Sequence, residues 1–397
     1  MKKVAVIGGG ASGLIASIYA SINNEVTIIE RNNKCGKKIL MTGNGKCNYW
    51  NEFQSLTKYH SQNKELLEPI ITPENQQEIL NFFDNLGIIP KIKNGWYYPY
   101  SNQAISINYA LNLENSLSNV TILNNTVVTN ISKINDTFEI ATSNGLIKAD
   151  KVILATGSKA MPQTGSDGSG YTLAKSLGHT IINPLPALVS LKGNQKYLKK
   201  WAGIRTDVKI SLNDIVELGE IQLTDYGISG ICVFNLSYKV NQLLQHQKSV
   251  KLCIDFLPWL ELDNFYNFIE KRNSKLKKRN ISELFDGMLN YKLVNVLLEL
   301  SNINSNDNWN KLTDNQKKSL MKNLRNFTFE VTDSNSFDKA QICSGGIPLK
   351  EINPKTMESL KTEGLYIVGE LLDVNGDCGG YNLSFAWLSG MIAGKNL

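Results

Sequence analysis

Three glycines near the amino terminus stand at the spacing that dinucleotide-binding turns require. Gly8, Gly10 and Gly13 form the pattern G-x-G-x-x-G. In such a turn Gly8 allows the sharp bend, Gly10 lets the backbone approach a pyrophosphate, and Gly13 lets helix and strand pack closely. Glu30 follows Gly13 by 17 residues, and its carboxylate could accept hydrogen bonds from ribose hydroxyls. These residues together predict a dinucleotide site.

Two strands and a helix must position these residues. The segments KVAVI, residues 3–7, and VTIIE, residues 26–30, are typical of buried parallel strands. The helix between them should begin at Ala11 and Ser12, so that its N-terminus meets the phosphates. The face of this helix that we expect to be buried consists of Leu14, Ile15, Ile18, Tyr19 and Ile22.

The segment after Glu30 favours FAD over NAD. It is long, glycine-rich and basic where a plain NAD domain would begin its next helix. Its lysines offer charge to a pyrophosphate, and its glycines and amides can surround the ribityl chain and the flavin edge. A surface turn with solvated lysines is the alternative. The residues expected to contact FAD here are Arg31, Lys37, Lys38, Thr42, Gly43, Gly45, Lys46, Cys47 and Asn48.

Strand patterns continue the same domain. TVVTNI, residues 126–131, predicts a strand whose Val128 backbone could pair with the adenine edge or simply belong to the core. TFEIATSNGLIKAD, residues 137–150, predicts a small β-meander. KVILATGS, residues 151–158, predicts a buried strand that ends in three candidate cofactor residues, Ala155, Thr156 and Gly157. This order of elements is typical of two-part flavoprotein domains.

The last thirty residues repeat the arrangement of strand, glycine turn and helix. GLYIVGE, residues 364–370, predicts a buried strand that ends at Gly369 and Glu370, and Asp373 could bind ribityl hydroxyls. A helix up to Ala393 should follow, with its positive end directed at the N1/C2 region of the flavin. That region becomes anionic on reduction, so the helix would stabilise reduced flavin. The candidates at the helix start are Gly379, Gly380, Tyr381, Asn382 and Leu383.

No side chain stands out as a general base. His60, His179 and His246 lie in unrelated contexts and are interpreted as surface or packed residues. The catalytic candidates are Tyr98, Cys378 and Asn382, and for hydride transfer to or from flavin N5 positioning can be sufficient. Tyr97, Tyr98 and Tyr100 of GWYYPY could form an aromatic pocket or supply a proton, or could stack in a strand corner. Cys378 could be redox-sensitive, or simply a small residue in a tight turn.

A second nucleotide fingerprint is missing. Residues 165–170, GSDGSG, contain glycines but follow no buried strand directly, and they are interpreted as a loop with a helix start at Tyr171. Either NAD(P)H binds without a domain of its own, or oxygen reoxidises the flavin.

Composition limits the class of protein. With 397 residues, 42% hydrophobic and 20% charged, the chain is long enough for two or three ordinary domains. Six scattered cysteines without a C-x-x-C pair predict neither a zinc site nor a dithiol centre. No apolar run approaches the ~20 residues of a membrane helix, and we expect a cytoplasmic protein. The net charge of +6 includes one basic run, interpreted as a solvated face, at Lys271, Arg272, Lys275, Lys277, Lys278 and Arg279.

The middle of the chain predicts an insertion. Short strand-like runs from about Leu188 to Phe256, with a helix after Phe234, indicate a small barrel or sandwich, and helical periodicity follows up to Asn326. We therefore expect a discontinuous FAD-binding domain of residues 1–187 and 340–397. The expected insertions are a β-barrel-like domain, 188–256 and 327–339, and a helical domain, 257–326. Substrate should enter between the flavin and the insertion.

Several motifs resemble one family over nearly the whole chain. KKILMTGNGKCN, PALVSL, LTDYGISG, CSGGIPLKEINPKTMES and GLYIVGELLDVNGDCGGYNLSFAWLSGMIAG are similar to segments of the bacterial flavoproteins known as the aminoacetone oxidase or BaiN/RdsA family. The resemblance implies FAD and an α/β, Rossmann-like core of the two-dinucleotide-binding-domain type with β-rich and helical insertions. Members include amine oxidases and reductases of conjugated steroid ketones. Lys46 and Ile231 depart from the family's usual Arg and Pro, and Lys46 lacks the planar fork of arginine.

Three functions follow as hypotheses. The first is an FAD-dependent reductase of an activated C=C or carbonyl small molecule, with hydride transfer through flavin N5 and NAD(P)H as donor. The second is an oxidase of a small amine such as aminoacetone, which would produce peroxide from oxygen. The third, a flavoprotein that associates with tRNA, rests only on the basic run.

Overall fold

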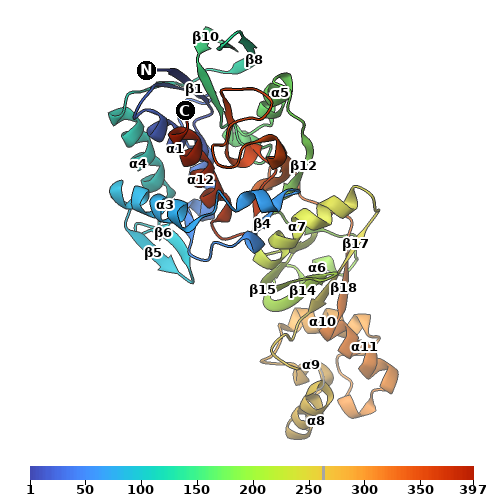
Figure 1. Cartoon of the computed structure of the whole chain (residues 1–397). Helices are drawn as coiled ribbons and strands as arrows, with labels where there is room; N and C mark the ends of the chain where they lie inside the picture. Colours follow the sequence, from blue (N-terminus) through green and yellow to red (C-terminus); the bar gives the residue numbers. More distant parts are fainter. Residues whose placement is uncertain (262–263) are drawn as a thin grey trace. The chain divides into compact units, whose positions relative to one another are not determined.

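The computed structural model describes residues 1–261 and 264–397. The chain divides into two compact units, Met1–Pro186 with Phe337–Leu397, and Ala187–Ser336. Each unit has its own hydrophobic core. Figure 1 shows the elements of both.

A parallel sheet with the strand order β21-β11-β1-β2-β7 forms the centre of the first unit. Its strands are short and almost wholly apolar, as expected for parallel strands covered on both faces. All five end at the same edge of the sheet. Their bounds are Lys3–Ile7 (β1), Glu25–Ile29 (β2), Val120–Leu123 (β7), Lys151–Leu154 (β11) and Leu365–Ile367 (β21).

Smaller sheets and helices surround this centre. The predicted meander is confirmed as the antiparallel sheet β10-β9-β8, and GWYYPY lies in the sheet β3-β6-β5. The strands are β3 (Trp50–Asn51), β4 (Tyr59–His60), β5 (Pro90–Lys93), β6 (Trp96–Pro99), β8 (Val128–Ile134), β9 (Thr137–Thr142), β10 (Gly145–Ala149), β12 (Ile182–Ala187), β20 (Ile342–Gly346) and β22 (Asn375–Gly376). The helices are α1 (Ala11–Ala20), α2 (Lys37–Met41), α3 (Pro73–Asn85), α4 (Ala104–Leu117), α5 (Ser169–Ser176) and α12 (Tyr381–Lys395).

Two sequence-based boundaries were wrong. Because α1 ends at Ala20, Ile22 lies beyond the helix and is 71% exposed instead of buried. Helix α5 begins at Ser169, two residues before the expected start at Tyr171, because the glycine turn leads directly into the helix. The other predicted strands and helices of the α/β core are present, which confirms the fold class.

The second unit contains an antiparallel sheet with the order β18-β17-β14-β15-β16-β13-β19, on which α7 packs. Helices follow β17 in the chain. The strands are β13 (Leu191–Lys192), β14 (Arg205–Leu212), β15 (Ile215–Leu223), β16 (Gly227–Ser229), β17 (Val250–Asp255), β18 (Phe327–Val331) and β19 (Asp333–Ser334). The helices are α6 (Leu198–Trp201), α7 (Ile231–Leu244), α8 (Phe265–Lys275), α9 (Ile281–Leu284), α10 (Tyr291–Leu300) and α11 (Asp314–Arg325).

The sheet and the helices of this unit share one hydrophobic core. The predicted division of the insertion into a barrel-like and a helical domain stays a prediction. Residues 262 and 263 of the predicted helical domain lie outside the described residues.

Candidate cofactor site

The first glycine turn lies at the carboxyl edge of the parallel sheet. Gly8 has a φ of 104°, and a Cβ there would lie 2.5 Å from the carbonyl oxygen of Ala155. A Cβ on Gly13 would collide with the carbonyl oxygen of Gly8. At Gly10, by contrast, a Cβ would meet nothing within 4 Å. Packing therefore requires Gly8 and Gly13, whereas Gly10 faces open space, where a ligand could approach the backbone.

Glu30 follows directly after β2, and hydrogen bonds fix the orientation of its side chain. The residue is 6% exposed. Its carboxylate accepts hydrogen bonds from the Gly9 backbone N–H at 2.8 Å and from the backbone and side-chain nitrogens of Asn32 at 2.8 and 2.7 Å. An ionised carboxylate has about four acceptor positions. These three bonds orient Glu30 and leave capacity for a ribose hydroxyl.

The loop of residues 165–170 packs against the residues after Glu30. Arg31 forms an ion pair with Asp167 at 2.5 Å between Nη1 and Oδ2. Asn32 donates to the Thr164 carbonyl at 3.0 Å and accepts from Lys37 Nζ at 3.1 Å. The sequence pattern predicts Arg31 and Lys37 at the cofactor but indicates no role for this loop. Such a contact between distant segments leaves no signal in the sequence pattern.

Lys38 and Glu370 bind each other across the first unit. Lys38 Nζ lies 2.6 Å from Glu370 Oε2, and both side chains are about one-fifth exposed. The hydroxyl of Ser158, which follows Gly157 (φ 73°), donates to the same oxygen at 2.9 Å. The pair joins the glycine-rich segment after Glu30 to the end of β21. A direct contact of either residue with FAD stays a prediction.

The segment of residues 42–48 turns through several left-handed conformations. Gly43, Asn44, Gly45 and Cys47 have φ values of 55°, 54°, 80° and 56°. Cys47 is buried, and burial raises the pKa of its thiol to about 12, so the thiol stays protonated near neutral pH.

Three other candidates of this segment differ in their surroundings. The Thr42 hydroxyl donates to the Ile39 carbonyl at 2.6 Å, and Lys46 is exposed. Asn48 is 8% exposed, and its Oδ1 has no hydrogen-bond partner among the described residues. An unpaired buried acceptor is rare in proteins and marks Asn48 as a candidate ligand-binding residue.

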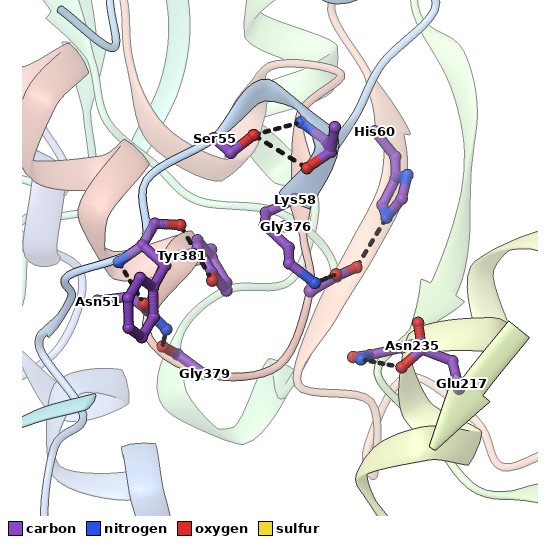
Figure 2. A network of polar contacts seen from close by, with 12 residues as sticks. Asn51, Ser55, Lys58, His60, Glu217, Asn235, Gly376, Gly379 and Tyr381 are labelled. Atoms are coloured by element: carbon purple, nitrogen blue, oxygen red, sulfur yellow. Dashed lines mark hydrogen bonds and ion pairs between the residues drawn. The ribbon is translucent and has the colours of Figure 1, made fainter. Parts of the chain in front are cut away.

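The second glycine turn lies directly before α12, and hydrogen bonds connect it and the helix start to residues 50–53. Gly379 and Gly380 have φ values of 129° and 98°. The Asn51 side chain donates to the Gly379 carbonyl at 2.7 Å, and the Tyr381 hydroxyl donates to the Phe53 carbonyl at 3.3 Å (Figure 2). Backbone amides at the start of an α-helix lack intrahelical acceptors, so this end can bind a negative or carbonyl oxygen.

The Asn382 side chain is used to hold the turn before α12. Its Oδ1 accepts from the Gly376 N–H and its Nδ2 donates to the Gly376 carbonyl, both at 2.8 Å. A direct catalytic role for Asn382 stays a prediction. Leu383 lies in the first turn of α12 and is half-buried.

Helices α1 and α12 run side by side and parallel (Figure 1). Their backbones approach closely, because a Cβ on Gly390 or Gly394 would collide with the carbonyl oxygens of Ser12 and Ala16, respectively. Tyr381 lies nine residues before Gly390, whereas Ala11 lies one residue before Ser12. At 1.5 Å per residue, the N-terminus of α12 therefore begins about 12 Å beyond that of α1. This offset is of the order that an extended ribityl chain spans between a pyrophosphate and a flavin ring.

Two acidic residues, Asp373 and Asp377, lie in the segment of the chain that connects β21 to α12. Asp373 is buried and accepts from the Gln62 N–H at 3.0 Å, and burial raises the pKa of its carboxyl. Asp377 binds His60 Nε2 at 2.9 Å and Lys58 Nζ at 3.3 Å. Figure 2 shows His60 and Lys58 in this network. The sequence pattern does not predict this network, because 317 residues separate the histidine from the aspartate.

Two of the catalytic candidates come together beside the glycine-rich segment. The Tyr98 ring lies 3.6 Å from the position of a Cβ on Gly43. Burial and the nearby Cys378 raise the pKa of Tyr98, and burial raises the pKa of Cys378 to about 11. Both groups therefore stay protonated near neutral pH. Tyr98 can donate a proton, whereas Cys378 is not a thiolate.

Other cofactor candidates lie at the start of β8 and directly after β11. Thr126 donates its N–H to the Glu30 carbonyl at 2.9 Å, which brings the start of β8 beside the acid. Val128 is the first residue of β8 and is half-buried. The Thr156 hydroxyl is buried and has no hydrogen-bond partner among the described residues. Contacts of Val128, Ala155, Thr156, Gly157 and Gly369 with FAD stay predictions.

The other two histidines have different surroundings. His179 is buried, with Nδ1 2.9 Å from Glu351 Oε2 and Nε2 2.8 Å from Ser359 Oγ. His246 is exposed. In the described part of the chain, no group of three or more His, Cys, Asp and Glu side chains could hold a metal ion. None of the helices among those residues combines the length and apolarity needed to cross a membrane.

Comparison with known proteins identifies the family. The model of the HI0933-like protein Rossmann domain matches residues 2–396. The chain is 39% identical over 403 residues to the 3-dehydro-bile acid delta(4,6)-reductase of Clostridium scindens, which covers 100% of this chain and 98% of the relative. It is 29% identical over 396 residues to the ribosomal RNA dihydrouridine synthase of Haemophilus influenzae, covering 97% and 95%. The solved Escherichia coli quinol fumarate reductase FrdA shares the fold, with a TM-score of 0.51 and 14% identity over 100% of this chain and 70% of that one.

These similarities agree with the motifs, and they confirm the resemblance inferred from the sequence. The family match spans almost every residue, including both glycine turns. The chain therefore belongs to the HI0933-like Rossmann family, and its fold is that of a flavoprotein oxidoreductase.

Proposed function

We propose that this protein is an FAD-dependent reductase of a C=C bond conjugated with a carbonyl, with NAD(P)H as electron donor. The observation that carries the proposal is the pair of parallel helix starts, α1 and α12, about 12 Å apart along their common direction. Bound FAD would supply the hydride chemistry. The relative with 39% identity supports a reductase over an oxidase.

The names of the relatives point to one class of reaction. A delta(4,6)-reductase of a 3-dehydro bile acid and a synthase of dihydrouridine both add two hydrogens to a C=C bond next to a carbonyl. Such a reaction needs one hydride and one proton. The raised pKa of Tyr98 keeps its hydroxyl protonated, and the tyrosine lies beside Gly43 of the predicted flavin-binding segment. Tyr98 is our candidate for the proton donor.

Anaerobic reduction of the purified flavoprotein tests the proposal. NADH or NADPH should bleach the flavin absorbance, and a 3-oxo-4,6-diene bile acid should restore it. Tyr98→Phe should leave bleaching unchanged and slow the restoration by roughly 10²-fold or more. Bleaching by a small amine instead, with peroxide formed in air, would favour the oxidase. If neither nicotinamide bleaches the flavin, NAD(P)H is not the donor.

RNA is the second candidate substrate. The relative from Haemophilus influenzae acts on ribosomal RNA by its name. In the basic run, Arg272 is used internally, since its Nε donates to the Leu284 carbonyl at 2.6 Å, and Arg279 pairs with Asp286 at 3.8 Å. The four lysines of the run, Lys271, Lys275, Lys277 and Lys278, are exposed. Exposed lysines at this density can bind phosphates.

A binding measurement separates the two substrates. If RNA is the substrate, changing the four lysines to glutamine should weaken binding of ribosomal RNA strongly at low salt and reduce the salt dependence. Reduction of the bile acid should then be absent in the unchanged protein. Unaltered RNA binding by the variant would remove the support that these lysines give.

A further inference from the structure

The start of α12 faces a buried acceptor that has no partner. Asn48 Oδ1 lies 3.0 Å from the position that a Cβ on Gly380 would occupy, and the Trp50 carbonyl oxygen lies 2.9 Å from the same point. Asn48 is 8% exposed, and within the described residues its Oδ1 receives no hydrogen bond. Gly380, with a φ of 98°, is the residue before the first turn of α12. A lone acceptor and the amides of a 15-residue helix therefore meet at one place.

These two features complement an imide. A buried carbonyl-type oxygen needs an N–H donor, and helix-start amides need an acceptor oxygen. An imide edge offers an N–H between two carbonyl oxygens, and the pyrimidine ring of a flavin has such an edge at C2, N3 and C4. We propose that Asn48 Oδ1 accepts the hydrogen bond of flavin N3–H while the first amides of α12 bind the C2 carbonyl. This assignment rests on the proposed FAD cofactor and names the residue that orients its ring.

The segment that carries Asn48 is fastened to α12. Asn51 donates to the Gly379 carbonyl at 2.7 Å, and the Trp387 indole donates to the Tyr49 carbonyl at 2.9 Å. The Gln54 amide donates to Ser384 Oγ at 3.0 Å. All three contacts join residues 49–54 to the turn or helix that begins at Gly379. These contacts hold the residues that follow Asn48 against α12 without any ligand, so little of this segment has to be ordered on binding, which lowers its cost.

Reconstitution with a flavin that lacks the N3 proton tests the assignment. Apoprotein should bind 3-methyl-FAD about tenfold more weakly than FAD, which is the effect of losing one buried hydrogen bond. Asn48→Ala should bind FAD more weakly than the unchanged protein and should distinguish the two flavins by less than about twofold. Asn48→Asp should place a negative charge beside the ring and make the reduction potential of bound FAD more negative. Dissociation constants come from flavin fluorescence quenching.

A control and a second readout keep the outcomes distinct. Asn81→Ala, at an exposed position of α3, should bind both flavins as the unchanged protein does. If the unchanged protein binds 3-methyl-FAD as tightly as FAD, the assignment is wrong even where the Asn48 variants fail to fold. If Asn48→Ala binds FAD normally but loses the substrate, Asn48 faces an imide of the substrate instead, and the assignment is also wrong. Discrimination between the flavins without any reductase activity would support the assignment and reject the proposed reaction.

Discussion

Hydrogen bonds hold both glycine turns of the first unit, but the partners lie at different distances along the chain. The turn before α1 is completed by nearby residues, since Gly9 and Glu30, which bind each other, are 21 residues apart. The turn before α12 depends on contacts of Asn51 with Gly379 and of Tyr49 with Trp387, over 328 and 338 residues. A local site leaves a spacing pattern in the sequence, whereas a site built from distant segments does not. The comparison also predicts that the two turns will respond differently to substitution.

The largest effect is expected at the first turn. Gly13→Ala would drive a Cβ into the carbonyl oxygen of Gly8, which is backbone and cannot move away easily. We expect a loss of about 3 kcal/mol or more in the free energy of unfolding, measured by urea denaturation. Gly10→Ala is the matched control. Its Cβ meets nothing within 4 Å, so stability should change by less than about 1 kcal/mol, while FAD affinity falls because the open space is filled. Equal stabilities of the two variants would contradict this account.

An intermediate effect is expected at the second turn. Asn51→Ala removes the donor to the Gly379 carbonyl and the acceptor of the Phe53 N–H. Leaving the buried Gly379 carbonyl unpaired should cost about 2 kcal/mol in the free energy of unfolding and should weaken FAD binding. Gln77→Ala removes an exposed side-chain hydrogen bond to Asn81 and should change stability by less than about 0.5 kcal/mol. A normal affinity for FAD in Asn51→Ala would show that the fastening is dispensable.

A pH effect should come from His179, outside both turns. Burial lowers the pKa of His179 below its ordinary 6.5, although Glu351 opposes this shift. Below pH 6.5 the unfolded chain therefore binds a proton that the folded chain does not, so stability should fall as pH drops, by up to about 1.4 kcal/mol per pH unit. Denaturation between pH 7.5 and 5.5 measures this slope. His179→Gln should reduce it, and an unchanged slope would assign the effect to other groups.

The smallest effect is expected at Lys46. The side chain is exposed and belongs to the glycine-rich segment of residues 42–48. Lys46→Ala should leave the free energy of unfolding within about 0.5 kcal/mol. If the lysine meets the cofactor, FAD affinity should fall modestly and the fall should shrink at high salt, since exposed charges are screened. Salt-independent loss of affinity would point to a different cause.

Sequence patterns predicted the α/β core well because its strands and helices are short-range features. Strands form within the segments at residues 3–7, 137–150 and 151–158, and the C-terminal helix begins at Tyr381. Ile22 was misplaced because the apolar period continues past the end of α1, where only packing decides which residues are covered. The pairing of His60 with Asp377 leaves no pattern in the sequence, since the two residues are distant in the chain.

The candidate site divides in the same way. Gly8, Gly10, Gly13 and Glu30 carry the N-terminal half by type and spacing alone, because the turn, the helix start and the acid belong to one continuous unit. The tertiary structure alone revealed that Lys38 pairs with Glu370, that Tyr98 lies near Cys378, and that Asn48 presents an unpaired oxygen to α12. Such contacts arise only when the chain folds and brings segments that are distant in sequence together. The amino-acid sequence by itself thus determined the glycine turn and the acid of the predicted cofactor half-site, and packing decided which side chains lie beside them.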